Sequence, residues 1–345
     1  MKRFILSLIL MLGIWNQGVA KDKEPEDIIN STVNAISVCN PIRYRNLTIF
    51  PLAFAKGRDK KSIITLDEAF RKDYIKIMEK ESGDVNTVIL VNTSKYYVFL
   101  LSGEIITGCK QDRMVSEDCL IPPHSGKIHL KVYCTEHGRW TAQSHKFSTG
   151  GMTINPKMRQ AAKASRDQGE VWAQVEEKRS EVGANASPTS RYMDILEDKT
   201  VAKELKPYID KFSNIPDVRG WNTVGVLAAV GDEIMVVDLF TNHKLFKKLW
   251  KKLIKSYALD AINRNPEGKL SKGNALDFIR ELNDINLSTR NTDGAGDAYT
   301  IDGYDSFGTT LIFDKRPVHL DLFPEEGSQH PKRIPILDFR REEIR

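Results

Sequence analysis

The chain has 345 residues, of which 41% are hydrophobic and 28% charged, and only 14 are proline. This composition is typical of a folded globular protein and excludes the disordered and fibrous classes. The formal net charge of +5 falls to +3 without Lys2 and Arg3, and so small an excess argues against a nucleic-acid partner. The length suits one large domain or two ordinary ones.

Residues 1–20 have the features of a cleavable secretory signal peptide. The two basic residues precede the uncharged apolar run Phe4–Ile14, which is shorter than the roughly 20 residues that a bilayer span needs. Gly18 and Ala20 occupy the positions that signal peptidase reads, and Lys21 stands where a lipid-anchored protein has Cys. We therefore expect an exported protein, periplasmic or secreted, with no membrane span after cleavage. Residues 21–42 then form an N-terminal segment.

Strand patterns dominate the region from Leu47 to about Trp140. Runs rich in Val, Ile, Leu and Tyr between turn residues predict strands at Thr87–Asn92, Tyr96–Leu101 and Lys127–Cys134. One short helix interrupts them, because the Thr-Leu-Asp-Glu sequence at 65–68 fits a capping box, in which a Thr hydroxyl and a Glu carboxylate satisfy free backbone amides at a helix start.

Two helices are expected in the middle of the chain. The first begins at Asn155-Pro156 and continues to about Val182, where Gly183 ends it. A loop at 183–190 follows, and the second helix occupies about 200–212, before Pro216.

The last third of the chain combines strands and helices. Thr223–Val230 and Glu233–Phe240 predict a β-hairpin around a Gly-Asp turn, helices are expected at about 242–261 and 271–282, and strands return at about 286–322. Residues 324–345 form a terminal tail. The sequence thus predicts an α+β fold, with antiparallel β-rich sheets at both ends of the chain and several inserted helices.

The helix expected at 242–261 carries many lysines, which could meet an anionic membrane or an acidic partner. Its apolar residues fall on one face, at Phe246, Leu249, Trp250, Leu253 and Tyr257. A helix of this pattern usually packs its apolar face into the core and leaves its lysines in solvent, so we favour the core interpretation.

The four cysteines, Cys39, Cys109, Cys119 and Cys134, would enter an oxidising compartment after export, which leaves three pairings open if all four pair. Cys109 and Cys119 flank an expected hairpin and are the possible disulfide. Four reduced, buried thiols are an equally weighted alternative.

No metal site or cofactor is indicated. The group His124, His129, Cys134 and His137 lacks the spacing of a zinc site. A calcium-loop-like run near residues 291–302 has Ala295 at a ligand position. Walker, dinucleotide, zinc-protease and serine-hydrolase signatures are absent from the sequence.

A dense group of polar residues is expected at strand ends in the first region, where scaffolds often present functional side chains. Its charged groups, amide and indole suit a small anionic or sugar-like ligand, and the candidate ligand-binding residues are Glu104, Lys110, Gln111, Arg113, Glu136, Arg139 and Trp140. A hydrolase acting on a phosphorylated or glycosidic substrate is a second interpretation, with Glu104 or Glu136 as general base and Arg113 or Arg139 holding a phosphate or carboxylate. In a third, Glu104 pairs with Arg113, or Glu136 with Arg139, and merely ties loops together, as in a structural envelope protein.

Several segments resemble the ADP-ribosylglycohydrolase- and rhodanese-phosphatase-associated protein (ARPP) domain family. They are Leu47–Leu52, Thr65–Ala69, Gly103-Glu104, Lys110–Arg113, Cys134–Trp140, Val236–Phe240, Leu245-Phe246, Trp250, Lys252-Leu253, Ser256–Ala261 and Val318–Leu322. The resemblance implies one domain over about residues 43–323. It departs from the family pattern at Cys109 and Asp112, where the family favours Ala and Asn.

The family resemblance implies no established reaction, because the family label records only an association with enzymes of ADP-ribose and phosphate metabolism. It also implies that the lysine-rich helix belongs to the body of the domain. We therefore expect an exported ligand-binding or interaction domain, whose protein partner is unknown.

Overall fold

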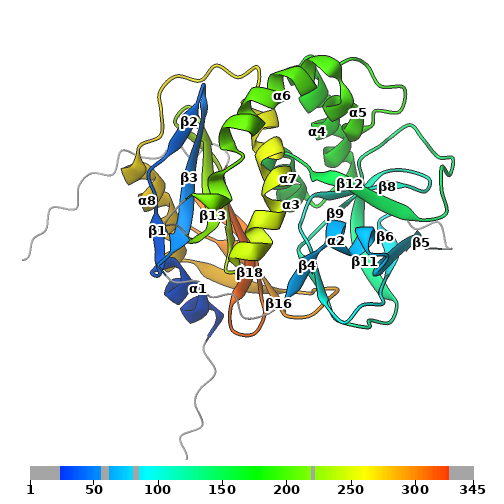
Figure 1. Ribbon diagram of the computed structural model, residues 1–345, viewed down its shortest axis with the longest axis horizontal. Helices are drawn as coiled ribbons and strands as arrows, with labels where there is room; N and C mark the ends of the chain where they lie inside the picture. The colour runs from blue at the N-terminus through cyan, green and yellow to red at the C-terminus, as the bar shows by residue number, and fades with distance from the viewer. Residues whose placement is uncertain (1–23, 56–61, 81–84, 219–221, 326–345) are drawn as a thin grey trace, which may run out of the picture.

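The computed structural model describes residues 24–55, 62–80, 85–218 and 222–325, so the expected signal peptide lies outside the described residues. Those residues form eight α-helices and 18 strands, which confirms the α+β class. Figure 1 shows a large sheet on one side of the molecule, smaller sheets on the other and helices between them.

The large sheet has nine strands. It combines strands from the first and last parts of the chain, because N-terminal β3 pairs with β13, and β13 is followed in the sheet by the remaining strands of the last third. The strand order is β1-β3-β13-β14-β18-β17-β16-β15, with β2 also on β3, and these neighbouring strands pair antiparallel. The strands are β1 (Ile36–Val38), β2 (Ile42–Tyr44), β3 (Leu47–Phe54), β13 (Asn222–Val230), β14 (Glu233–Phe240), β15 (Asn286–Arg290), β16 (Asp297–Asp302), β17 (Ser306–Ile312) and β18 (Pro317–Pro324).

Both faces of this sheet are covered in its centre, so its central strands are apolar on both sides. One face packs on α1 (Pro25–Val33) and α8 (Lys272–Arg280). The other packs on α7 (His243–Ala261), with α3 (Pro156–Ser165) beside it. Alternate residues of each strand face opposite layers; on β18, Leu320 and Leu322 face α1 and α8, whereas Phe323 faces the α3 and α7 side.

The second body holds the expected first β region in two smaller sheets. One has the order β12-β8-β9-β11-β6-β5 and the other β10-β7-β4. Their strands are β4 (Ile63–Thr65), β5 (Ile75–Glu79), β6 (Thr87–Asn92), β7 (Tyr97–Leu100), β8 (Glu104–Gly108), β9 (Arg113–Val115), β10 (Cys119–Ile121), β11 (Ile128–Cys134) and β12 (Phe147–Thr153). Strands β4 and β7 pair in parallel, with α2 (Leu66–Arg71) following β4, so the expectation of antiparallel sheets holds except at this pair.

The capping box predicted for α2 is confirmed, since Thr65 and Glu68 satisfy each other's backbone amides. The prediction of a single helix over 155–182 is wrong, because this segment forms two helices. The first, α3, is capped by Arg166, whose φ of 53° is left-handed, and a second helix, α4 (Gln168–Glu181), follows. The Asp167 side chain accepts a hydrogen bond from the Glu170 amide and so caps the second helix. The remaining helices are α5 (Tyr192–Glu197) and α6 (Lys199–Phe212), with short 3₁₀ turns at Ile215–Asp217 and Glu281–Asn283.

Helix α7 packs its aromatic face into the core, as the sequence predicted, with Phe246, Leu249 and Tyr257 fully buried. Lys252 departs from the expectation that the lysines face solvent, because it is only 3% exposed. Among the described residues, no helix combines the length and apolarity that crossing a bilayer requires.

Candidate functional site

Helix α3 directs two cations into the core of the protein. Arg159 and Lys163 are one turn apart and therefore share a face, which points at the large sheet. Arg159 is 1% exposed and Lys163 is 9% exposed. Charges are almost never buried to this extent unless they are paired, so their partners determine what this part of the structure does.

Asp238 of β14 is the partner of Arg159. The two terminal guanidinium nitrogens donate to its two oxygens at 2.9 and 2.7 Å, a bidentate geometry that is strong and directional. The Tyr257 hydroxyl of α7 also donates to Asp238. Burial alone would raise the pKa of Asp238, but Arg159 and His319 outweigh it and hold that pKa well below its usual value.

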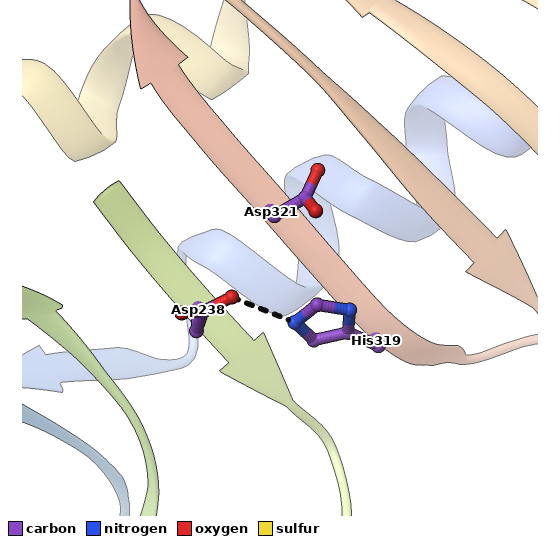
Figure 2. Close-up of side chains that lie close together, drawn as sticks. All are labelled: Asp238, His319 and Asp321. Atoms are coloured by element: carbon purple, nitrogen blue, oxygen red, sulfur yellow. Dashed lines mark hydrogen bonds and ion pairs between the residues drawn. The ribbon is translucent and has the colours of Figure 1, made fainter. Parts of the chain in front are cut away.

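His319 of β18 connects this ion pair to the second body. Its Nε2 lies 3.1 Å from Asp238 Oδ1, a contact shown in Figure 2, and its Nδ1 lies 2.6 Å from Asp118 Oδ2, in the loop between β9 and β10. Burial alone would lower the pKa of His319, but the carboxylates of Asp118 and Asp238 raise it to about 9. At neutral pH the imidazole is therefore charged, and both ring nitrogens donate.

Asp321 lies directly across from Asp238 in the paired strands β14 and β18. Lys163 donates to it at 2.6 Å, and the amide and hydroxyl of Thr309 on β17 each donate at 3.0 Å. Each of the two carboxylates thus has its own cation from α3. Together these contacts fix α3 to the sheet at two successive turns.

The group Asp238, His319 and Asp321 also has the spacing of a metal site, because one ligand atom from each lies within 4.8 Å of the others (Figure 2). Its chemistry argues against a metal. Arg159 and Lys163 already neutralise the two carboxylates, and a histidine that donates from both nitrogens has no lone pair for an ion. We therefore interpret the group as the anchor of α3.

The opposite side of α3 borders a pocket of about 550 Å³, which we call the α3 pocket. Its lining comes from α3, the start of α4 and the ends of β17 and β18, and consists of Gln160, Ala161, Ala164, Ser165, Glu170, Phe307 and Glu325. The small residues Ala161, Ala164 and Ser165 keep the helix side of the pocket open. Phe307 supplies a half-buried aromatic wall.

A second pocket of about 260 Å³ lies along the first half of α3 and shares Gln160 with the α3 pocket. Most of its charged lining pairs within itself: Lys178 contacts Asp260 and Glu181 at 2.6 Å each, and Arg264 contacts Glu233. Asp260 also accepts from the Lys157 amide at 3.0 Å, at the start of α3. These groups stabilise the N-terminal end of the helix.

The structure separates Glu104 from the other residues that the sequence grouped with it. Glu104 is 0% exposed and pairs with Lys252 of α7, not with Arg113. Lys252 also contacts Asp67 of α2 at 2.8 Å. Burial raises the pKa of Glu104, whereas the two carboxylates outweigh burial at Lys252 and raise the pKa of its ammonium.

Glu136 and Arg139 do meet, in a buried bidentate pair with distances of 2.9 and 2.7 Å. Asp112 lies beside them, 3.5 Å from Arg139, and accepts from Arg191 at 2.6 Å. Arg139 also donates to the Cys109 carbonyl at 2.7 Å. These contacts hold the 135–146 loop against the turn after β8, so the pair of Glu136 and Arg139 ties these two loops together.

The remaining predicted residues divide between the interior and the surface. Arg113 is buried and donates to the Gln111 side chain at 2.9 Å. Lys110 lies on the surface, 5.0 Å from the centroid of the Trp140 ring, which is half exposed. No pocket described here is lined by these residues.

The four cysteines are free and buried, so the possible Cys109–Cys119 disulfide is not formed in this structure. The Cys109 amide donates to the Ser144 hydroxyl at 2.9 Å, whereas the Cys119 sulfur lies against Gly294. Burial raises the pKa of Cys109 to about 11 and also raises that of Cys119. Cys109 and Cys119 pack in the apolar core of the second body, whereas the Cys134 sulfur accepts a hydrogen bond from Arg113 at 2.6 Å.

Sequence reasoning missed the charges beneath α3, although a signal was present. Asp238 and Asp321 each stand inside a mainly apolar strand, in the sequences Val-Val-Asp-Leu-Phe and His-Leu-Asp-Leu-Phe. A charge in such a strand needs a buried partner. The basic residues Arg159 and Lys163 of α3 could then have been predicted to supply the partners of these two carboxylates.

The fold and this charged core define an α+β domain in which helices are pinned to sheets by buried ion pairs. The chain matches the ARG and Rhodanese-Phosphatase-superfamily-associated Protein (ARPP) domain over residues 35–323, and it belongs to that family. The match begins slightly before the expected start at residue 43 and ends where we expected. No curated protein and no solved structure matches the chain.

Proposed function

We propose that this protein is an exported binding protein whose α3 pocket holds a small sugar-like molecule, either uncharged or amine-bearing. The lining of that pocket carries the proposal. It combines an aromatic wall, Phe307, with an amide, a hydroxyl and two carboxylates, and its volume of about 550 Å³ lies in the ~300–1,000 Å³ range of ligand sites. Four of the seven lining residues are polar, and a polyhydroxy ligand requires such hydrogen-bond partners together with an aromatic face for its ring.

Charge decides which of the two expected ligand classes suits this pocket. The ionisable side chains of its lining are Glu170 and Glu325, both acidic. The carboxylate of Glu170 would repel an anionic ligand, whereas sugar hydroxyls or an amine can donate to it. The pocket therefore favours the sugar-like ligand over the anionic one.

Rigidity supports a binding role as well. Arg159 and Lys163 fix α3 to the sheet from beneath, so the wall formed by Gln160, Ala161 and Ala164 does not have to become ordered when a ligand enters. A preorganised wall lowers the entropic cost of binding. The buried ion pairs and the pocket thus belong to one arrangement.

Native mass spectrometry and calorimetry on the mature chain test the proposal with a panel of neutral sugars, amino sugars, sugar phosphates and nucleotides. We expect neutral sugars or amino sugars to bind. Ala164→Trp fills the pocket and should abolish that binding, whereas Ala173→Trp, on the exposed face of α4, should leave it unchanged. Binding of phosphorylated ligands alone, or binding that survives Ala164→Trp, would contradict the assignment.

Export is tested separately. The signal features of residues 1–20 support cleavage after Ala20. Expression of the full chain in a bacterium, followed by fractionation and N-terminal sequencing, should yield a periplasmic or secreted protein that begins at Lys21. A cytoplasmic product that retains residues 1–20 would refute export without affecting the assignment of the pocket.

A further inference from the structure

Lys255 of α7 is partly buried, whereas the other lysines of this helix are either paired with a carboxylate or, as for Lys244 and Lys251, exposed. Lys247, Lys248 and Lys252 each contact a carboxylate, at Asp217, Glu68 and Glu104 respectively. For Lys255, the described part of the chain supplies neither a carboxylate nor a hydrogen-bond acceptor. Its ammonium is therefore half-buried without a compensating charge.

The Lys255 side chain lines a pocket of about 180 Å³ between α5, α6 and α7, which lie next to one another in Figure 1. The rest of the lining is mainly apolar and comprises Leu196, Ala202, Leu205, Lys206 and Ile209. Apolar walls disfavour the charged form of an amine and hold an alkyl group well. Lys255 is thus both partly buried and part of the lining of an apolar cavity.

The charged groups around Lys255 act in the same direction as the apolar walls. Lys251 stands one turn earlier on α7 and repels a second ammonium, and Lys206 of α6 also lines the pocket, with Asp210 as its ion-pair partner. The α5 contribution to the lining, Leu196, carries no charge. Burial, followed by repulsion from Lys251, lowers the pKa of Lys255. Desolvation and a cationic neighbour are the two conditions that activate lysine nucleophiles.

We propose that Lys255 is a carbonyl-reactive lysine, which binds a small apolar aldehyde or ketone in this pocket as an imine. The neutral amine nitrogen adds to the carbonyl carbon, and the carbonyl oxygen takes up a proton to give a carbinolamine. Loss of that oxygen as water then forms the C=N bond. Amine and carbonyl compound give imine and water, so no oxidant or reductant is consumed. This site is independent of the α3 pocket.

Reductive alkylation of the mature protein tests the proposal. The protein is treated at neutral pH with limiting butanal and cyanoborohydride, which traps imines as stable butyl-lysine, and labelled sites are quantified by peptide mass spectrometry. We expect Lys255 to be labelled several-fold faster than Lys244, an exposed lysine on the same helix. Equal labelling of the two lysines would overturn the proposal.

Two further comparisons separate the pocket from the amine. Each buried methylene is worth roughly a factor of four, so the preference for Lys255 over Lys244 should rise by about 15-fold over the two methylenes from acetaldehyde to butanal. Ala202→Leu narrows the pocket and should remove this dependence on chain length, whereas Lys203→Leu, at the adjacent exposed position outside the lining, should not. An equal preference for both aldehydes would rule out the pocket as a binding site.

Discussion

Replacing Asp238 by Asn probes the anchor of α3, because this substitution keeps the shape of the side chain and removes its charge. Asp238 is 0% exposed and accepts both terminal nitrogens of Arg159. In the variant, the guanidinium stays in the core without its anion. Removing one partner of a buried ion pair costs roughly 3–5 kcal/mol. At about 2 °C per kcal/mol for a large domain, Tm should fall by roughly 6–10 °C.

Calorimetry and urea unfolding followed by circular dichroism measure this loss. Asp217→Asn is the matched control, because Asp217 and its partner Lys247 are both 52% exposed and such pairs contribute little. The double variant Arg159→Met/Asp238→Asn should lose less than the sum of its single variants, since it leaves no unpaired guanidinium. A Tm for Asp238→Asn equal to that of Asp217→Asn would refute the anchor.

Two further predictions concern the same sheet. The pKa of His319 is about 9 in the folded protein against 6.5 unfolded, so its contribution to stability is complete below pH 6.5 and is lost as the pH rises through 9. The free energy of unfolding should therefore drop by roughly 3 kcal/mol over that range, and urea titrations of His319→Gln should show this slope flattened. Gly308→Ala places a Cβ onto the backbone oxygen of Asp321 and should cost about 1–3 kcal/mol, whereas Gly126→Ala, which meets no atom within 4 Å, should have no such effect on the urea midpoint.

Hydrophobic periodicity carried the prediction of the fold. The hairpin at 223–240 and the helix at 242–261 follow from strongly patterned segments, and the structure has them within a residue or two. The break between α3 and α4 escaped prediction, because it depends on one left-handed residue, Arg166, and on the cap formed by Asp167. The parallel pairing of β4 with β7 escaped as well, since sheet partners distant in sequence leave no local pattern.

The charged groups show a sharper limit. Local spacing suggested that Glu136 pairs with Arg139, three residues away, and this pair exists. Glu104 instead pairs with a lysine 148 residues away, and Lys163 lies 158 residues from Asp321. A dense group of polar residues in the sequence therefore indicates where charged side chains occur, but it does not show which distant residues they pair with. Only the fold distinguishes a buried ion pair from a group available to a ligand.

Lys252 provides the remaining test of that distinction, because it joins α7 to Glu104 of the second body. Lys252→Met keeps the aliphatic bulk and leaves Glu104, which is 0% exposed, without its cation. Burial already raises the pKa of Glu104 from 4.5, and the loss of Lys252 should raise it further. The folded variant then holds a proton that the unfolded chain releases, so its stability is retained below pH 4.5 and declines as the pH rises toward the folded pKa. Urea midpoints at about pH 4.5 and pH 8 should show a gap from wild type that widens with pH, toward roughly 3–5 kcal/mol. Lys252→Met/Glu104→Gln removes the titrating group and should abolish the widening; a gap of constant size would mean that Lys252 contributes packing alone.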